Sequence, residues 1–324
     1  MKEIIAKFLD QFQSALNIKV SSPNFIKAGS VFDKVIFCGM GASASASGIV
    51  SDLFLKNICF HFCRDYKLPS FTDENSLIII VSYSGNTDEA ISCFQEVFSK
   101  NLNLAVIASD GELVKLAKFK NIPYFLISEK GIPPRMSIGY QMIGLVKILI
   151  AFGILTNETL GFFKDLKIDS GKLEKIGKIL AKKFVNKIPV IYSVADFKSL
   201  AYLWKTNFNE NSKIHAFSNV FPEINHNEIE SFLSKKWQRS VAPIFLESDS
   251  ERIFKKSVEM GIKAIKKSKY FVEIIKLVGT NDVEKTIYGI ILSYWISYYL
   301  AVLLKVDPVS NKNIIWIKSQ IKNK

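Results

Sequence analysis

Hydrophobic and polar positions follow two alternating periods along the first half of the chain. Short apolar runs rich in β-branched residues predict buried strands, and the segment after each run repeats its apolar positions with a helical period. The predicted strands cover residues 34–38, 58–63, 77–81, 104–108 and 124–127, and the predicted helices cover residues 45–55, 87–99, 111–119 and 136–155. This rhythm predicts an α/β fold with a doubly wound, mostly parallel sheet that binds ligands beyond the carboxyl ends of its strands.

The same rhythm starts again in the second half. Polar residues interrupt the apolar pattern near residues 155–170. Predicted strands then follow at residues 189–193, 214–219, 241–246 and 270–277, with helices at 197–208 and 252–266. A chain of 324 residues suits two domains of about 150 residues, each large enough for its own core. We therefore predict two αβα domains, residues 1–155 and residues 156–324, the second ending in a terminal helix.

Two segments bear on membranes and export. Residues 1–18 mix charged and apolar positions as an amphipathic helix does, so we expect no signal peptide. Residues 287–304 carry no charge and are long enough to raise the possibility of a membrane span. They contain two serines, four tyrosines and a tryptophan, and no second uncharged segment of this length accompanies them in the sequence. We predict a helix buried between domains or subunits, and no membrane association.

The charge balance adds little to the predicted fold. The chain has 43 Lys and Arg against 30 Asp and Glu, a formal net charge of +13. The lysines are scattered, and no Arg-rich run or basic motif interleaved with aromatics occurs. The composition therefore indicates a lysine-rich solvated surface and no nucleic-acid partner. An apolar content of 48% excludes a disordered chain.

The four cysteines, Cys38, Cys59, Cys63 and Cys93, lie in apolar segments, which predicts buried free thiols and a cytoplasmic location. Cys59 and Cys63 flank His61, which raises the question of a metal site. Structural zinc sites use four ligands in closely spaced pairs, whereas this segment offers three. We predict no metal and no cofactor, and we interpret His61 and His215 as packing residues within strands.

Residues 82–87, Ser-Tyr-Ser-Gly-Asn-Thr, are the most informative segment, and we call them the phosphate loop. They join a buried strand to a helix. Free backbone N–H groups and the helix dipole at such a junction favour an anion, and short hydroxyls add donors. A capped turn is the alternative, because turns favour the same residues. Three hydroxyls in six positions favour a bound phosphate: Ser82, Ser84 and Thr87.

A second loop, Gly-Met-Gly-Ala-Ser at residues 39–43, follows the first predicted strand. A dinucleotide-binding motif needs a third glycine where Ala44 stands, and a P-loop needs Gly-Lys-Ser/Thr, so neither fits. We interpret this loop as backbone that closely approaches a phosphorylated ligand, with Gly41 in the loop and Ser43 as a donor. The corresponding loop of the second half, residues 193–196, has no glycine and carries an acid, so we expect one phosphate site.

Two charged residues stand in unusual contexts. Arg135 follows two prolines that stiffen its backbone, and an arginine at the rim of a strand-end cleft can stabilise an oxyanion. A solvated arginine at a helix start is the alternative. Glu210 lies among amides at a predicted helix end, where a carboxylate opposes the helix dipole. Such a locally unfavourable choice suggests function, and a carboxylate with a raised pKa suits proton abstraction.

Several motifs together resemble a known family. The phosphate loop looks like the S-x-S-G-x-T loop of sugar isomerase (SIS) domains. Five further motifs occur in order: Gly39–Ser43, Pro133–Arg135 with Gly139-Tyr140, Asn209–Asn211, Pro222–Glu228, and Asp307-Pro308 to Lys318. Over nearly the whole chain these are similar to the bifunctional phosphoglucose/phosphomannose isomerases, which have two SIS domains. The chain departs from the family pattern at Ala42, where a glycine is usual, and at Val309, near which a hydroxyl residue is usual.

The resemblance assigns a reaction and its residues. It implies interconversion of glucose 6-phosphate, and of mannose 6-phosphate, with fructose 6-phosphate through a cis-enediol and without a cofactor. On residue type alone, His226 is best interpreted as structural and Lys318 as solvent-exposed. The resemblance instead makes Glu210 the base, Arg135 the enediolate partner, and His226 and Lys318 the ring-opening groups. Ser43, Ser82, Ser84 and Thr87 would hold the phosphate.

The resemblance also implies a homodimer with shared active sites, in which His226 faces the site of the partner subunit. Apolar segments at residues 143–155 and 287–304 exceed what one chain needs to bury, which favours the same prediction. Two alternatives remain: a SIS module that binds a sugar phosphate without turning it over, and an isomerase of another phosphosugar such as an amino sugar phosphate.

Overall fold

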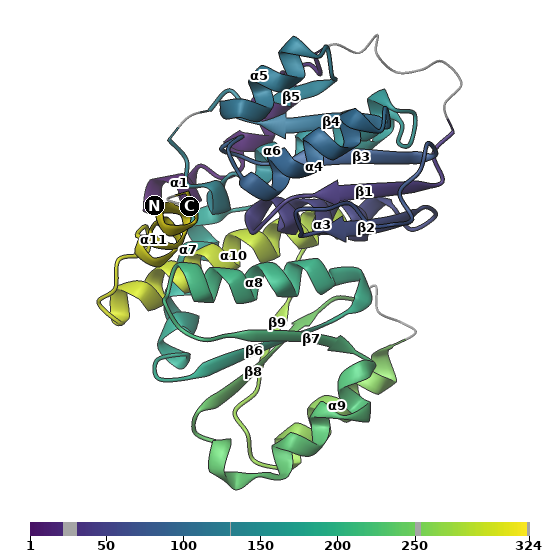
Figure 1. The fold of residues 1–324 in the computed structure, drawn as a ribbon. Helices are drawn as coiled ribbons and strands as arrows, with labels where there is room; N and C mark the ends of the chain where they lie inside the picture. The colour runs from purple at the N-terminus through teal and green to yellow at the C-terminus, as the bar shows by residue number, and fades with distance from the viewer. Residues whose placement is uncertain (22–30, 130, 250–253, 323–324) are drawn as a thin grey trace.

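A computed structural model describes residues 1–21, 31–129, 131–249 and 254–322 (Figure 1). Its first sheet has five parallel strands in the order β2-β1-β3-β4-β5. They are β1 (Lys34–Cys38), β2 (Cys59–Cys63), β3 (Ser76–Val81), β4 (Asn103–Ala108) and β5 (Tyr124–Leu126). The order reverses between β1 and β3, so ligands are expected beyond the carboxyl ends of these two strands.

Helices cover both faces of this sheet. They are α3 (Ala42–Phe54), α4 (Asp88–Ser99), α5 (Gly111–Phe119) and α6 (Ile138–Ala151). Helix α2 (Asp10–Leu16) packs on α6, and α1 (Lys2–Ala6) contacts helices of the second half of the chain. Alternate strand residues serve the two faces: Val35 and Ile79 belong to the apolar core under α3 and α6, whereas Ile36 and Ile78 belong to the core under α4 and α5. This division explains why the strands are continuously apolar.

The second sheet has four parallel strands in the order β7-β6-β8-β9. They are β6 (Ile188–Val194), β7 (Phe217–Phe221), β8 (Val241–Glu247) and β9 (Glu273–Lys276), and the helices are α7 (Ser170–Lys183), α8 (Lys198–Glu210), α9 (Lys255–Lys267), α10 (Asp282–Leu303) and α11 (Lys312–Lys322). Short 3₁₀ turns complete the order: η2 (Pro134–Met136), η3 (Asn157–Phe163), η4 (Ala195–Phe197), η5 (Glu223–His226), η6 (Glu228–Leu233) and η7 (Lys235–Trp237). The predicted α/β class with two parallel sheets is confirmed.

The element predictions are wrong in three places. The strand predicted at 214–219 begins only at Phe217, because Ile214 is tied back to the end of α8 through its N–H and carbonyl. The strand predicted at 270–277 is shorter, since only β9 pairs with β8. Helix α7 was not predicted. The predicted start of α9, residues 252 and 253, lies outside the described residues.

Three side chains predicted to be buried are exposed. Cys59 and His61 lie on β2, an edge strand, where the outer positions face solvent. The His61 ring meets the Phe71 ring edge-on, with centroids 5.2 Å apart. His215 lies before the edge strand β7 and is exposed as well. An edge strand buries fewer positions than a central strand, so alternation of apolar and polar residues was not enough to predict burial of these three side chains.

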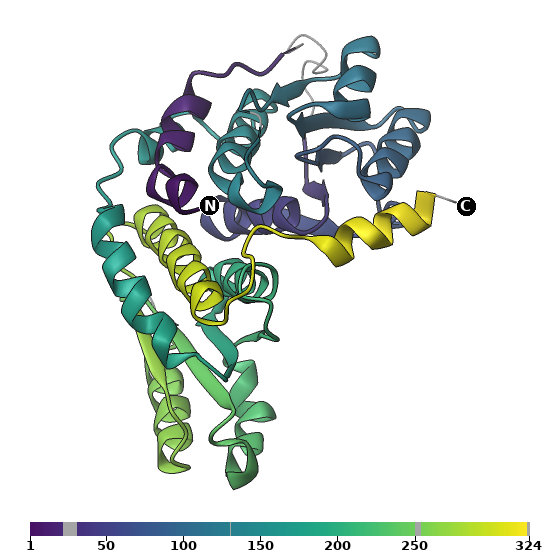
Figure 2. The ribbon, with the colours of Figure 1, turned by 90° about the vertical axis from the view of Figure 1, so that its left-hand side faces the viewer.

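Helix α10 is the uncharged segment that raised the question of a membrane span. It is long and apolar enough to cross a membrane by length and composition, yet 72% of its most apolar window is buried inside the protein. It packs against α7 and α8, and Tyr294 and Trp295 are fully buried. Helices α8 and α10 lie between the two sheets (Figures 1 and 2). The prediction of a buried helix is confirmed. The domain boundary at residue 155 stays a prediction, because a single apolar core includes side chains from both sheets.

A buried carboxylate lies where α3 meets α8. Asp52 accepts a hydrogen bond from the Ser199 N–H at 2.9 Å, and the Lys198 ammonium lies 3.8 Å away. The Asp52 side chain is only 5% exposed. Burial raises its pKa from 3.8 to about 6, and the Ser199 and Lys198 contacts offset only part of this effect. The native state therefore holds a proton on Asp52 more tightly than the unfolded chain does.

Asp52→Asn is therefore expected to remove a pH-dependent loss of stability. The folded-state pKa lies above the unfolded one, so the wild type loses free energy of unfolding as pH rises through 4 to 6, by about 3 kcal/mol at most. The amide does not titrate and keeps an acceptor for Ser199. Denaturant unfolding of both proteins between pH 4 and pH 7 measures the difference, in which all other titrations cancel. A difference that stays constant with pH would contradict the prediction.

Candidate functional site

A cavity of about 440 Å³ lies at the carboxyl ends of β1 and β3. Its walls come from the loop after β1, the phosphate loop after β3, turn η2, the end of α8, and helix α11. Eight of the nine predicted site residues line it: Gly41, Ser43, Ser82, Ser84, Thr87, Arg135, Glu210 and Lys318. The topology thus brings together residues that lie up to 277 positions apart, from 41 to 318.

The phosphate loop has a fixed internal geometry. The Ser82 and Thr87 hydroxyls lie 2.9 Å apart and share a hydrogen bond. Thr87 precedes the first residue of α4 without capping the helix through its side chain. Gly85 adopts φ +66°, and a Cβ there would lie 1.8 Å from the Asp110 carbonyl oxygen, so only glycine fits. Hydroxyls and the N-terminus of α4 therefore meet at one wall of the cavity.

Helix α5 holds this loop in place from behind. The Asn86 amide oxygen accepts the Glu112 N–H at 2.9 Å, and the Gly85 carbonyl accepts the Leu113 N–H at 3.0 Å. The Tyr83 carbonyl accepts both the hydroxyl and the N–H of Ser109. A loop fixed in this way can hold its donors toward an anion without first losing conformational entropy.

The loop after β1 lines the cavity beside the phosphate loop. A Cβ on Gly39 would lie 2.7 Å from the Val81 carbonyl oxygen, so the ends of β1 and β3 approach closely at this point. Gly41 adopts φ +55°, and no atom lies within 4 Å of its Cβ position. Ala42 begins α3, and Ser43 is buried in its first turn. The alanine that departs from the family pattern is thus accommodated as an ordinary first residue of a helix.

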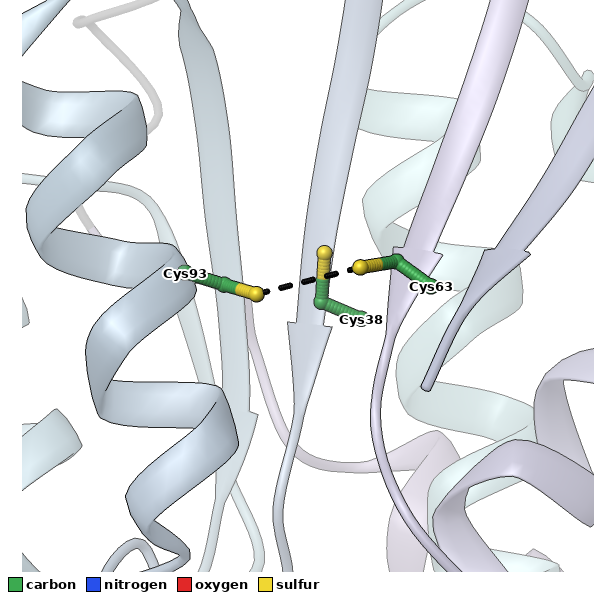
Figure 3. A group of neighbouring side chains, drawn as sticks. All are labelled: Cys38, Cys63 and Cys93. Carbon is green, nitrogen blue, oxygen red and sulfur yellow. Dashed lines mark hydrogen bonds between the residues drawn. The ribbon is translucent and has the colours of Figure 1, made fainter. Parts of the chain in front are cut away.

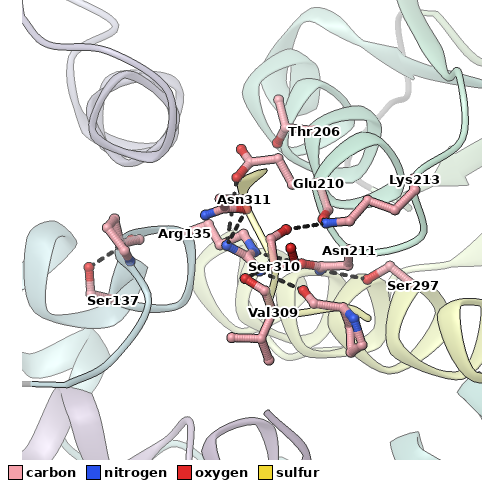
Figure 4. A network of polar contacts seen from close by, with 12 residues as sticks. Arg135, Ser137, Thr206, Glu210, Asn211, Lys213, Ser297, Val309, Ser310 and Asn311 are labelled. Atoms are coloured by element: carbon pink, nitrogen blue, oxygen red, sulfur yellow. Dashed lines mark hydrogen bonds and ion pairs between the residues drawn. The ribbon is translucent and has the colours of Figure 1, made fainter. Parts of the chain in front are cut away.

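Arg135 is the centre of a buried polar network (Figure 4). Its side chain is 4% exposed. Its guanidinium donates to the amide oxygens of Asn211 at 2.7 Å and Asn311 at 3.2 Å, and to the carbonyls of Pro308 at 2.6 Å and Val309 at 3.2 Å. Burial lowers its pKa from the ordinary value, although Glu210 counteracts this. The alternative of a solvated arginine is therefore wrong.

Glu210 lies beside this guanidinium. One carboxylate oxygen is 3.8 Å from the Arg135 Nη1, and the side chain is 27% exposed, so it still reaches the cavity. Burial raises the pKa of Glu210 above its ordinary value, and the positive charges of Arg135, Lys213 and Lys205 lower it by less. A partly desolvated carboxylate that remains accessible suits a general base.

Lys213 supports the site without lining the cavity, and the sequence pattern did not identify it. Its ammonium donates to the Glu210 carbonyl and, at 2.6 Å, to the Ser310 carbonyl, so it ties the end of α8 to the C-terminal segment (Figure 4). Asn211, the last residue of the Asn209–Asn211 motif, holds Arg135 in place by accepting a hydrogen bond from its Nε, a role that the sequence did not predict. Only the polar cluster at the end of α8 could have signalled these residues.

Helix α11 extends along the half of the molecule that contains the first sheet, as Figure 2 shows. Lys318 lies on it, exposed to solvent, and lines the cavity together with Ile314 and Ile315. The C-terminal segment thus forms part of the cavity wall. Val309 takes part through its carbonyl, while its side chain is 46% exposed.

His226 is the predicted residue that the chain does not bring to the cavity. It lies on turn η5, which follows β7 in the second sheet, and it is exposed. It is absent from the cavity lining among the described residues. In the described chain His226 therefore lies apart from the other predicted site residues.

The arrangement has a clear chemical capacity. Hydroxyls and a helix N-terminus at one wall suit a phosphate. A carboxylate and a guanidinium at the other wall suit proton transfer next to a carbonyl, with stabilisation of the oxyanion that develops. The two walls belong to one cavity, so a small phosphorylated carbonyl compound can contact both.

Comparison with known proteins agrees with this geometry. The family model described as the bacterial phospho-glucose isomerase C-terminal SIS domain matches residues 174–321. The bifunctional phosphoglucose/phosphomannose isomerase of Aquifex aeolicus is 31% identical over 294 residues, 89% of this chain and 90% of that protein. The protein of the same name from Thermoplasma volcanium is 33% identical over 318 residues, 96% and 99% of the two chains.

Solved structures share the fold. The C-terminal domain of glucosamine-fructose-6-phosphate aminotransferase from Francisella tularensis matches with a TM-score of 0.73 at 13% identity, over 96% of this chain and 99% of that one. At this level of identity the likeness concerns the fold alone.

Proposed function

Because the chain belongs to the bifunctional phosphoglucose/phosphomannose isomerase family, we propose that it interconverts glucose 6-phosphate, and mannose 6-phosphate, with fructose 6-phosphate. One observation carries the proposal: Glu210, with its pKa raised by burial, lies beside Arg135 in the same cavity as the phosphate loop. Transfer of a proton between C1 and C2 requires one carboxylate that can take and return the proton.

The phosphate anchors the substrate at the end remote from the reaction. Ser43, Ser82, Ser84 and Thr87 would donate to it, together with the first N–H groups of α4. The energy of this contact fixes the reacting carbons near Glu210, which lowers the entropic part of the barrier.

The proton transfer itself would use two groups. Glu210 takes the proton from one carbon, which gives a cis-enediolate, and returns it to the neighbouring carbon. Arg135 stabilises the negative oxygen through its positive charge. Hydrogen bonds to Asn211, to Asn311 and to backbone carbonyls fix the position of the guanidinium. Lys318 and a histidine would serve ring opening as acid and base.

The histidine would come from a second subunit. We propose a homodimer in which His226 reaches the cavity of its partner, and the exposed position of His226 outside its own cavity supports this. Residues 143–155 and 287–304 do not support the homodimer, because most positions of both segments are buried within a single chain. Exposed apolar side chains that lie near His226 in the sequence are better candidates for a subunit interface: Phe217, Leu233 and Trp237.

A coupled assay with fructose 6-phosphate tests the proposed function. Turnover to glucose 6-phosphate supports it, and parallel assays with mannose 6-phosphate and with an amino sugar phosphate define the substrate. Binding without turnover of any of these would identify a sugar-phosphate sensor instead. We also propose a cytoplasmic location, which the free thiols of all four cysteines support.

Ser84→Ala and Thr87→Ala are expected to weaken substrate binding without slowing saturated turnover. Each removes a neutral donor to a charged phosphate, which costs about 1.5–3 kcal/mol, or about 10- to 150-fold in Kd. Calorimetry with fructose 6-phosphate measures the affinity, and steady-state kinetics measures kcat. Ser99→Ala is the control, because its hydroxyl bonds only within the far end of α4. Unchanged affinity in both variants would place the phosphate elsewhere.

A further inference from the structure

Three cysteines from separate elements meet in the core between the first sheet and α4 (Figure 3). Cys38 is the last residue of β1, Cys63 is the last residue of β2, and Cys93 lies in α4. Cys38 and Cys63 are direct neighbours in the parallel pairing of the two strands. All three are buried, and their sulfur atoms lie within 4.8 Å of one another. The spacing of these cysteines in the sequence gives no signal of this cluster.

The separation of the Cys63 and Cys93 sulfurs is that of two ligands around one cation, and the Cys38 sulfur lies within 4.8 Å of both. A cation bonded to three sulfurs at about 2.3 Å holds them about 4 Å apart, and the Cys63 and Cys93 sulfurs are 3.9 Å apart. A fourth donor is near: the Asp65 carbonyl oxygen lies 3.4 Å from the Cys93 sulfur and 4.0 Å from the Cys63 sulfur. An oxygen at these distances can complete a tetrahedron.

We propose that Cys38, Cys63 and Cys93 form a binding site for one thiophilic cation, monovalent copper or zinc. Thiolates select these ions over harder ones. Three sulfurs suffice for Cu(I), whereas zinc would add the Asp65 carbonyl. Without a metal, the Cys63 and Cys93 thiols donate hydrogen bonds to the carbonyls of Asp65 and Lys67. Metal binding displaces the thiol protons, which pass to solvent. Affinity therefore falls at low pH.

The thiol site is separate from the catalytic groups but adjoins the loops that bind substrate. Cys38 directly precedes Gly39, and Cys93 lies in the helix that follows the phosphate loop. None of the three cysteines lines the 440 Å³ cavity. Metal binding is thus independent of whether the chain is an isomerase, and a filled site would hold β1, β2 and α4 together.

The test titrates the reduced full-length protein with Cu(I), and separately with Zn²⁺, against a chromogenic chelator. We expect one equivalent per chain and a rise in the thermal midpoint. X-ray absorption of the wild type is expected to show three sulfur neighbours for Cu(I), or three sulfurs and an oxygen for zinc. Cys38→Ser and Cys93→Ser should each weaken binding at least about 100-fold, because loss of an outer-shell partner alone costs about 10- to 100-fold. Cys59→Ser is the control and should bind as the wild type does.

Three results would overturn the site. One is the absence of stoichiometric binding of either ion by the wild type. Another is fewer than three sulfur neighbours in the absorption spectrum, a measurement that does not depend on any variant folding. The third is loss of binding in Cys59→Ser, since Cys59 is exposed and lies outside the cluster.

Discussion

Glu210→Gln is expected to lower kcat by about 10³-fold or more while binding of fructose 6-phosphate stays within a few-fold of the wild type. The amide has the shape of the carboxylate but cannot take a proton. Stopped-flow or coupled kinetics measures kcat, and calorimetry measures the affinity. Activity within a few-fold of the wild type would exclude Glu210 as the base.

The structure makes this substitution a clean one. Arg135 stays anchored without the carboxylate, because Asn211, Asn311 and two backbone carbonyls accept its other donors. The carbonyl of residue 210 still accepts from Lys213. Glu89→Gln is the matched control, since Glu89 lines the same cavity on the phosphate side and has no role in proton transfer. Its kcat should stay within a few-fold of the wild type.

The pH profile adds an independent readout. Burial raises the pKa of Glu210 above its ordinary value of 4.5. The base must be ionised to act, so the acid limb of the kcat/KM profile is expected to have its midpoint above that value. In Glu210→Gln this limb should be absent from the residual rate.

The fold was predictable wherever local pattern and packing agree. The strands at Lys34–Cys38 and Ser76–Val81 are central and buried on both faces, so their continuous apolar runs identified them. The phosphate loop was predictable for a similar reason. Its hydroxyls, glycine and helix start lie within one short segment, and the geometry that they need is local.

The remaining parts of the site depend on contacts that sequence pattern does not encode. Arg135 finds Pro308 and Asn311 more than 170 positions away, through the packing of the C-terminal segment on η2. The three sulfurs meet because β1 and β2 pair in one register and α4 crosses behind them. The position of β7 was missed, since side-chain hydrogen bonds of the preceding loop decide where pairing begins. The role that we propose for His226 depends on an assembly of two chains, because His226 lies outside the cavity of its own chain.

Mixing Glu210→Gln with His226→Ala is expected to restore activity from near zero to about a quarter of the wild type. If each site takes Glu210 from one subunit and His226 from the other, a mixed dimer has one site that lacks both groups and one that is intact. Random exchange makes about half of the dimers mixed, and each has one working site of two. Activity is measured after subunit exchange has been confirmed by mass spectrometry.

The structure supplies the matched control for this experiment. Lys318 and Glu210 line one cavity of the same chain. A mixture of Glu210→Gln with Lys318→Ala therefore leaves every site of a mixed dimer with one missing group, and it should recover nothing. Lys318 is exposed, so its truncation does not disturb the core. Recovery with His226→Ala but not with Lys318→Ala is the signature of a site shared between subunits. Equal failure of both mixtures despite full exchange would assign His226 to the cavity of its own chain or to no cavity, and would refute the shared site.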